Sequence, residues 1–120
     1  MKVEVEVKDG PPITGILKLS GLIETPQARD LRRVLEEMED KDKGIGRVIF
    51  DLSKVTFVSS TGFSLLVSYA NAKRGDWGEN PIVLAGPASS VKKAMQMLGI
   101  TGLFMVLPDL ESALSRFGLS

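Results

Sequence analysis

The hydrophobic residues of this sequence change their spacing several times along the chain, and these changes constrain the fold more than any other feature. In residues 2–8 valines alternate with charged residues, which predicts a half-exposed strand at the edge of a sheet. After a turn rich in glycine and proline, residues 13–19 predict a second strand that returns beside the first. From Thr25 the spacing becomes helical, and the glycines at 44 and 46 end that helix.

The rest of the chain alternates between short apolar runs and segments of helical spacing. The apolar runs predict strands at residues 48–50, 55–58, 82–85 and 103–107. Three more helices are expected. The first begins near Ser60, the second is capped by Ser89 or Ser90, and the third is capped by Asp109. Strands that alternate with helices are typical of α/β proteins. We therefore predict an α/β fold with a mostly parallel sheet of four to five strands, an antiparallel N-terminal edge strand and about four helices, without predicting the strand order.

Composition excludes several kinds of function. The 120 residues suit one domain, residues 1–120, and 15 Lys and Arg balance 15 Asp and Glu, so nothing attracts nucleic acid or anionic lipid. The chain has no cysteine and no histidine, which removes thiol nucleophiles, zinc thiolates, the usual general base and the commonest transition-metal ligand. We therefore expect no metal, no cofactor and no enzymatic activity.

The chain shows no sign of a membrane segment or a secretory signal. The longest uncharged stretch, residues 55–72, contains many hydroxyl side chains and is interrupted by Gly62. The first residues lack the apolar core of a signal peptide. We therefore expect a cytoplasmic protein that does not insert into a membrane.

A run of hydroxyl residues, Ser59, Ser60 and Thr61, precedes Gly62 at the expected junction between a strand and a helix. Unpaired backbone N–H groups and the positive end of the helix dipole favour an anion there. The structural alternative is that Ser59 or Ser60 only caps the helix and that Gly62 lets the backbone pass close to a neighbour. Spacing alone favours this structural alternative.

Helical spacing also places four residues of the next segment on one face. These are Thr61, Ser64, Leu65 and Ser68. This stripe is small, mostly polar and flat enough for a partner to approach closely. A solvated helix face is the alternative interpretation.

Residues 51–64 resemble the signature of anti-sigma factor antagonists, small bacterial members of the family named for sulfate transporters and anti-sigma factor antagonists (STAS). The matching segments are Asp51-Leu52-Ser53 and Phe57-Val58-Ser59-Ser60-Thr61-Gly62-Phe63-Ser64. Ser59 stands where the family usually has Asp, and Ser64 where it usually has a second Gly. The likeness continues, in the same order and spacing, over nearly the whole chain.

The resemblance implies a binding protein that is regulated by phosphorylation. Its partner would be an anti-sigma factor that is itself a serine/threonine kinase, and phosphorylation of the hydroxyl before the glycine, here Thr61, would end binding. The residues expected to contact the partner are Ser59, Ser60, Thr61, Gly62, Ser64, Leu65 and Ser68. A phosphate adds about −1.5 to −2 charge, which a helix N-terminus tolerates, so it would act by clashing with the partner and not by unfolding the protein.

Two other functions compete with this hypothesis. One is a constitutive scaffold or accessory subunit of a lipid-transport or stress-signalling complex, a role that the same family also fills. The other, which the composition disfavours, is an enzyme with a Ser or Thr nucleophile and Lys54 or Lys73 as its base.

Two further residues each have a functional and a structural interpretation. Trp77, in a glycine-flanked loop, either anchors an interface or folds back on its own domain, and the second is the more frequent arrangement. Asp51 either pairs with Lys54 or accepts backbone N–H bonds at the end of its strand.

Overall fold

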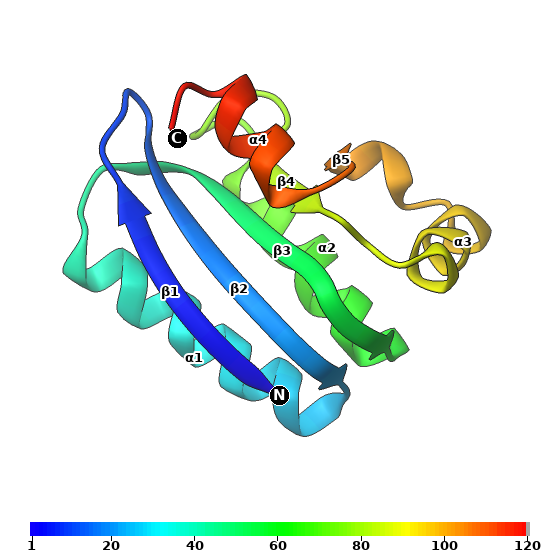
Figure 1. Ribbon diagram of the computed structural model, residues 1–120. Coiled ribbons are helices and arrows are strands. Elements are labelled where there is room, and N and C mark those ends of the chain that lie inside the picture. The colour runs from blue at the N-terminus through cyan, green and yellow to red at the C-terminus, as the bar shows by residue number, and fades with distance from the viewer. Residues whose placement is uncertain (120) are drawn as a thin grey trace.

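The computed structural model describes residues 1–119 and shows one five-stranded sheet with helices on both faces (Figure 1). Along the chain the elements are β1 (Lys2–Lys8), β2 (Ile13–Ile23), α1 (Thr25–Lys41), β3 (Ile45–Val58), α2 (Ser60–Lys73), β4 (Ile82–Ala85), α3 (Ser89–Leu98), a 3-10 turn (Thr101–Leu103), β5 (Met105–Leu107) and α4 (Leu110–Arg116). The strands lie in the sheet in chain order. β1 is antiparallel to β2, and the other neighbours are parallel. The predicted fold class is confirmed.

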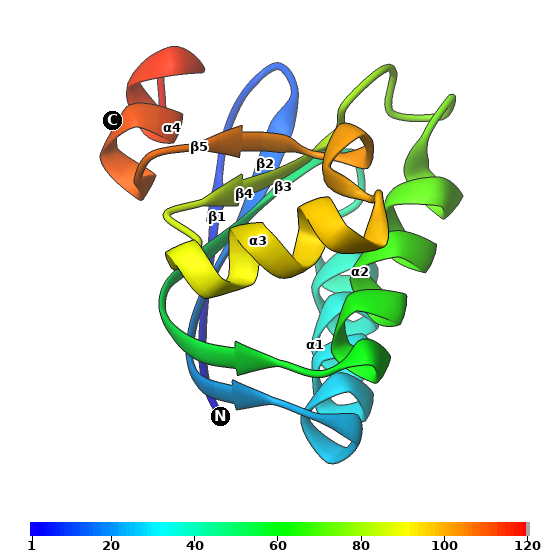
Figure 2. The ribbon, with the colours of Figure 1, turned by 90° about the vertical axis from the view of Figure 1, so that its right-hand side faces the viewer.

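The sheet has a hydrophobic core on each face, and the two cores differ in size. α1, α2 and α3 cover one face of the sheet, and α4 covers part of the other (Figure 2). The larger core lies under the three helices and includes Leu31, Phe50 and Leu66, all almost fully buried. The smaller core lies under α4, where Ala113 contacts strand residues such as Ile49. Most of the burial that stabilises the fold is therefore on the side of α1 and α2.

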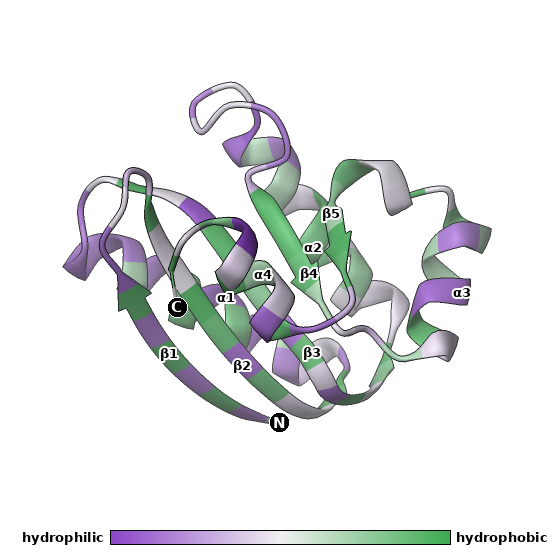
Figure 3. Ribbon diagram, turned by 45° about the horizontal axis from the view of Figure 1, so that its top comes forward, coloured by the Kyte–Doolittle hydropathy of each residue, from purple (hydrophilic) through white to green (hydrophobic). Residues whose placement is uncertain are grey.

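The first strand shows the alternation that predicted it. Hydrophobic and hydrophilic bands follow one another along β1 (Figure 3). Val3 and Val7 pack against the larger core, whereas Val5 is 46% exposed. A strand at the end of the sheet has a neighbour on one side only, so its apolar face is incompletely covered.

The third strand differs from the sequence-based prediction. The runs 48–50 and 55–58, predicted as separate strands, form one continuous strand, β3, paired along its length with a β2 that extends to Ile23. An irregularity in the register between Lys18 and Ser20 of β2, which pair with Asp51 and Lys54 of β3, keeps the ladder continuous past the exposed Ser53 and Lys54. Local polarity at residues 53–54 therefore marks a bulged region and not a strand end.

Two predictions near the end of the chain are also corrected. The last strand begins at Met105 and not at residue 103, because Thr101–Leu103 form a 3-10 turn. The N-cap of α3 is Ala88, and neither Ser89 nor Ser90 caps the helix, because both already lie inside it. By contrast, the Asp109 side chain caps α4 by accepting a hydrogen bond from Ser112 N, as predicted.

Candidate functional site

Two helices begin side by side at the same end of the sheet. β2 leads directly into α1 and β3 into α2, and because these strands are parallel neighbours, their carboxyl ends meet (Figures 1 and 2). The backbone N–H of Ser59 donates to the carbonyl of Ile23 at 2.9 Å, which ties the two strand ends together. Two helix N-termini therefore lie close together at the predicted hydroxyl segment.

Ser59 caps the second of these helices. Its backbone is extended, and its Oγ accepts a hydrogen bond from Gly62 N at 3.2 Å. The structural interpretation of Ser59 is confirmed, and Ser60 is instead the exposed first residue of α2. Aspartate is an equally good N-cap, so serine at this position keeps the cap while removing a negative charge.

Gly62 lies where a side chain has no room. A Cβ there would come within 2.8 Å of both the Ile23 carbonyl oxygen and Val58 Cγ1. Real Cβ atoms do not approach other atoms so closely. The glycine thus allows α2 to start directly against the ends of β2 and β3.

Thr61, the second residue of α2, is exposed. Its Oγ1 accepts a hydrogen bond at 3.1 Å from Oγ1 of Thr25, the first residue of α1. A hydroxyl has one proton and two lone pairs, so Thr61 keeps its own proton and one lone pair. The hydroxyl is held in position and is accessible from solvent.

The predicted stripe along α2 is only partly a surface. Ser60, Thr61, Ser64 and Ser68 are exposed, but Leu65 is 4% exposed and belongs to the larger core. Leu65 is therefore corrected from a surface contact to a core residue, because its side of α2 faces α1. Gly62 is also buried and contributes backbone alone.

An open groove of about 390 Å³ runs between α1 and α2 and includes Thr61. Its lining residues are Thr25, Ala28, Arg29, Arg32, Thr61, Ser64, Leu65 and Ser68. Sequence analysis missed Arg29 and Arg32, whose helical positions are four and seven residues after Thr25. That spacing puts both arginines on the same helix face as Thr25. It is the only signal in the sequence that could have predicted their place in the groove.

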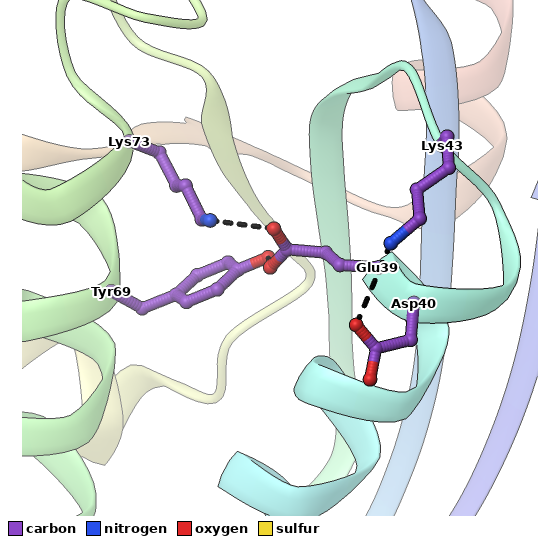
Figure 4. A network of polar contacts seen from close by, with 5 residues as sticks. All are labelled: Glu39, Asp40, Lys43, Tyr69 and Lys73. Atoms are coloured by element: carbon purple, nitrogen blue, oxygen red, sulfur yellow. Dashed lines mark hydrogen bonds and ion pairs between the residues drawn. The ribbon is translucent and has the colours of Figure 1, made fainter.

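The lysines considered as catalytic bases lie elsewhere. Lys73 Nζ donates to Glu39 Oε1 at 2.5 Å, and the Tyr69 hydroxyl donates to Glu39 Oε2 at 2.7 Å (Figure 4). Lys54 borders a separate groove on the sheet, near Lys18. Neither lysine lines the groove that holds Thr61.

Burial raises the pKa of the Tyr69 hydroxyl far above its usual value, and the neighbouring Glu39 carboxylate adds to the effect. Trp77 packs against the same network, with its ring edge to face with Tyr69 at 6.1 Å and Lys73 Nζ 4.8 Å from its centre. Trp77 therefore folds back on its own domain, which is the more frequent of the two predicted arrangements.

Asp51 has a structural role at its place in β3. The Asp51 carboxylate accepts a hydrogen bond from Ser53 N at 3.1 Å, which is the second of its two predicted roles. Within residues 1–119, no group of three or more carboxylate side chains is arranged to hold a metal ion, and no helix is both long and apolar enough to cross a membrane.

The fold is that of a small α/β domain with an exposed hydroxyl directly before a buried glycine. Comparison with known families identifies it: the STAS domain model matches residues 2–113, so this chain belongs to the STAS domain family. The resemblance seen in the sequence is confirmed.

Three known proteins illustrate the likeness. A candidate anti-sigma factor antagonist of Bordetella bronchiseptica, BtrV, is 28% identical over 117 residues, which cover 98% of this chain and 95% of BtrV. The anti-sigma factor antagonist SpoIIAA superposes in its unphosphorylated form with a TM-score of 0.76 at 20% identity, covering 96% of this chain and 95% of SpoIIAA. The phosphorylated form of SpoIIAA from Bacillus gives 0.71 at 18% identity, with 96% and 98% covered. A protein of Thermotoga maritima gives 0.80 at 15% identity, with 97% and 94% covered.

Proposed function

We propose that this protein is a cytoplasmic anti-sigma factor antagonist that binds an anti-sigma factor with serine/threonine kinase activity, and that phosphorylation of Thr61 ends the binding. The observation that carries the proposal is the exposed Thr61 hydroxyl, held at the start of α2 directly before the buried Gly62. The likeness to BtrV supports the class of function, and the existence of a phosphorylated SpoIIAA supports the kind of regulation. Proteins of this class generally act by binding and not by catalysis.

The surface beside Thr61 has the chemistry of a protein interface. A second open groove of about 390 Å³ lies between α2 and the end of α3 and contains no charged side chain. Its lining residues are Ser60, Phe63, Ser64, Val67, Ser68, Asn71, Leu98 and Ile100. Apolar contacts bordered by hydroxyls are typical of such interfaces, and Leu98 is 54% exposed at its edge. A partner that lies over this groove also reaches the neighbouring groove that Thr61 lines.

Phosphorylation adds charge at the edge of this surface without disturbing the fold. The kinase transfers the γ-phosphoryl group of a nucleoside triphosphate to Thr61 Oγ1: the Oγ1–P bond forms, the bond from Pγ to its bridging oxygen breaks, the nucleoside diphosphate leaves, and a kinase base takes the hydroxyl proton. Burying the resulting charge against neutral groups of the partner costs several kcal/mol. A micromolar complex is held by about 8 kcal/mol, so the partner is released.

The proposal is tested with the anti-sigma factor kinases of the source organism. With ATP, mass spectrometry should locate phosphate on Thr61, and the Thr61→Ala variant should bind but remain unmodified. Thr61→Glu should weaken binding at least tenfold, about 1.4 kcal/mol. Ser115→Glu, on the exposed surface of α4, is the matched control and should bind normally. Unchanged binding by Thr61→Glu and by the phosphorylated protein would refute the regulation.

A constitutive scaffold is the second candidate, and one observation favours it. The first turn of α2 has no acidic residue, and its N-cap is Ser59 where the family motif usually has an aspartate. Stable complex formation without any modification of Thr61 would support this role over the regulated one.

A further inference from the structure

Two arginines of α1 border the groove that holds Thr61. Arg29 and Arg32 follow Thr25 on one face of α1, and Thr25 already donates a hydrogen bond to Thr61. They are the charged residues that line this groove. Within the described part of the chain neither forms an ion pair, whereas the neighbouring Arg33 pairs with Asp30 at 3.3 Å.

We propose that the phosphate on Thr61 is held within the same molecule by Arg29 and Arg32, so that phosphorylation ties α1 to α2. This inference rests on the proposed phosphorylation of Thr61 and adds what becomes of the phosphate. A guanidinium is planar and always charged, and it donates two parallel hydrogen bonds to phosphate oxygens. Thr25 and the N-terminal N–H groups of α2 add further donors.

Intramolecular capture explains how the modified protein stays folded and free of its partner. The dianion lies in the groove between α1 and α2, which Thr61 itself lines, and two cations neutralise it there. A partner with no basic group of its own then gains nothing by approaching. Thr61 at the start of α2 and the two arginines of α1 are therefore two halves of one phosphate site, contributed by two helices.

The test installs phosphothreonine at position 61 of the full-length protein during translation, which needs neither the kinase nor the partner. A phosphorus NMR titration then measures the second pKa of the phosphate, ordinarily about 6. We expect this pKa to be lowered by about 0.5, because nearby cations favour the dianion. Arg29→Gln and Arg32→Gln should each raise it again, and the double variant should restore the ordinary value.

Arg33→Gln is the matched control, since it removes the same charge from α1 at a position that does not line the groove. Equal pKa values in the phosphorylated wild type and the double variant, or an equal rise with Arg33→Gln, would overturn the inference. Thermal unfolding gives a second readout: phosphorylation should raise Tm in the wild type and in Arg33→Gln but not in the double variant. If phosphothreonine fails to weaken partner binding, the proposed function fails whatever the arginines do.

Discussion

At the scale of single residues, Gly62 and Ser59 determine how α2 starts. Gly62 fits between the Ile23 carbonyl and Val58 because it has no side chain. The Ser59 side chain stabilises the first turn by accepting a hydrogen bond from Gly62 N. Both act on the backbone that presents Thr61. Their roles are structural, and the accessible hydroxyl depends on them.

Gly62→Ala should destabilise the protein by about 1–3 kcal/mol, because the new methyl group overlaps backbone that cannot easily move. Urea unfolding of the variant measures this loss. Gly102→Ala is the control, since no atom lies within 4 Å of a Cβ at that position. Equal stability of the two variants would show that the α2 start is not tightly packed.

Ser59→Asp restores the usual residue of the family. The carboxylate can cap α2 as the serine does and interacts well with the helix N-terminus, so the free energy of unfolding should rise or fall by no more than about 1 kcal/mol. Under the regulated hypothesis the kinase should modify Thr61 faster in this variant. A scaffold would show no modification with either residue, as measured by phosphate incorporation over time.

At the scale of elements, α1 and α2 are joined at both ends. Thr25 bonds to Thr61 where the helices begin, and near their other ends Glu39 of α1 accepts bonds from Tyr69 and Lys73 of α2 (Figure 4). The second junction is partly buried and lies on the larger core, with Phe50 in edge-to-face contact with Tyr69. The groove with Thr61 is therefore built between two helices whose separation is fixed.

The raised pKa of Tyr69 makes stability depend on alkaline pH. The folded state keeps the neutral phenol, whereas the unfolded chain ionises near pH 10, so the contribution of Tyr69 is complete below about pH 10 and is lost as pH rises above it. Tyr69 is the single tyrosine, so phenolate absorbance reports on it alone. We expect no titration near pH 10 in the folded protein and a normal one in urea. A normal titration in the folded protein would mean that the junction with Glu39 is open.

At the scale of the whole molecule, the two faces of the sheet are packed unequally. The larger core joins α1, α2 and α3 to the sheet, while the smaller core depends on α4, a helix of 7 residues. Arg47 stacks on Phe117 at 3.6 Å from the ring centre and adds a contact beside that helix. The candidate site lies on the strongly packed side, far from the weaker layer.

We expect α4 to open more readily than the rest of the protein. Hydrogen exchange should give lower protection for its amides than for those of β2 and β3, because a short helix over a small core unfolds locally at lower free energy. Phe117→Ala should lower the protection of α4 further and leave that of α2 unchanged. Equal protection throughout would show that the two layers unfold as one unit.

Features that depend only on neighbouring residues could be predicted from the sequence. Alternating valines gave the exposed edge strand, helical spacing from Thr25 gave α1, and the hydroxyl run before Gly62 marked the start of α2. These features follow from backbone preferences and side-chain periodicity over a few residues. For the same reason the polar residues 53–54 wrongly predicted a break between two strands, because a bulge and a strand end look alike locally.

Contacts between residues that are distant in the sequence could be seen only in the folded structure. It buried Leu65 against α1, placed Arg29 and Arg32 along the groove with Thr61, and joined Glu39 to Tyr69. Such contacts join residues that are far apart in the sequence: Glu39 and Tyr69 are 30 positions apart, and Thr25 and Thr61 are 36 apart. Which face of a helix lies against its neighbour is set by how both helices pack on the sheet, and no local pattern contains that information.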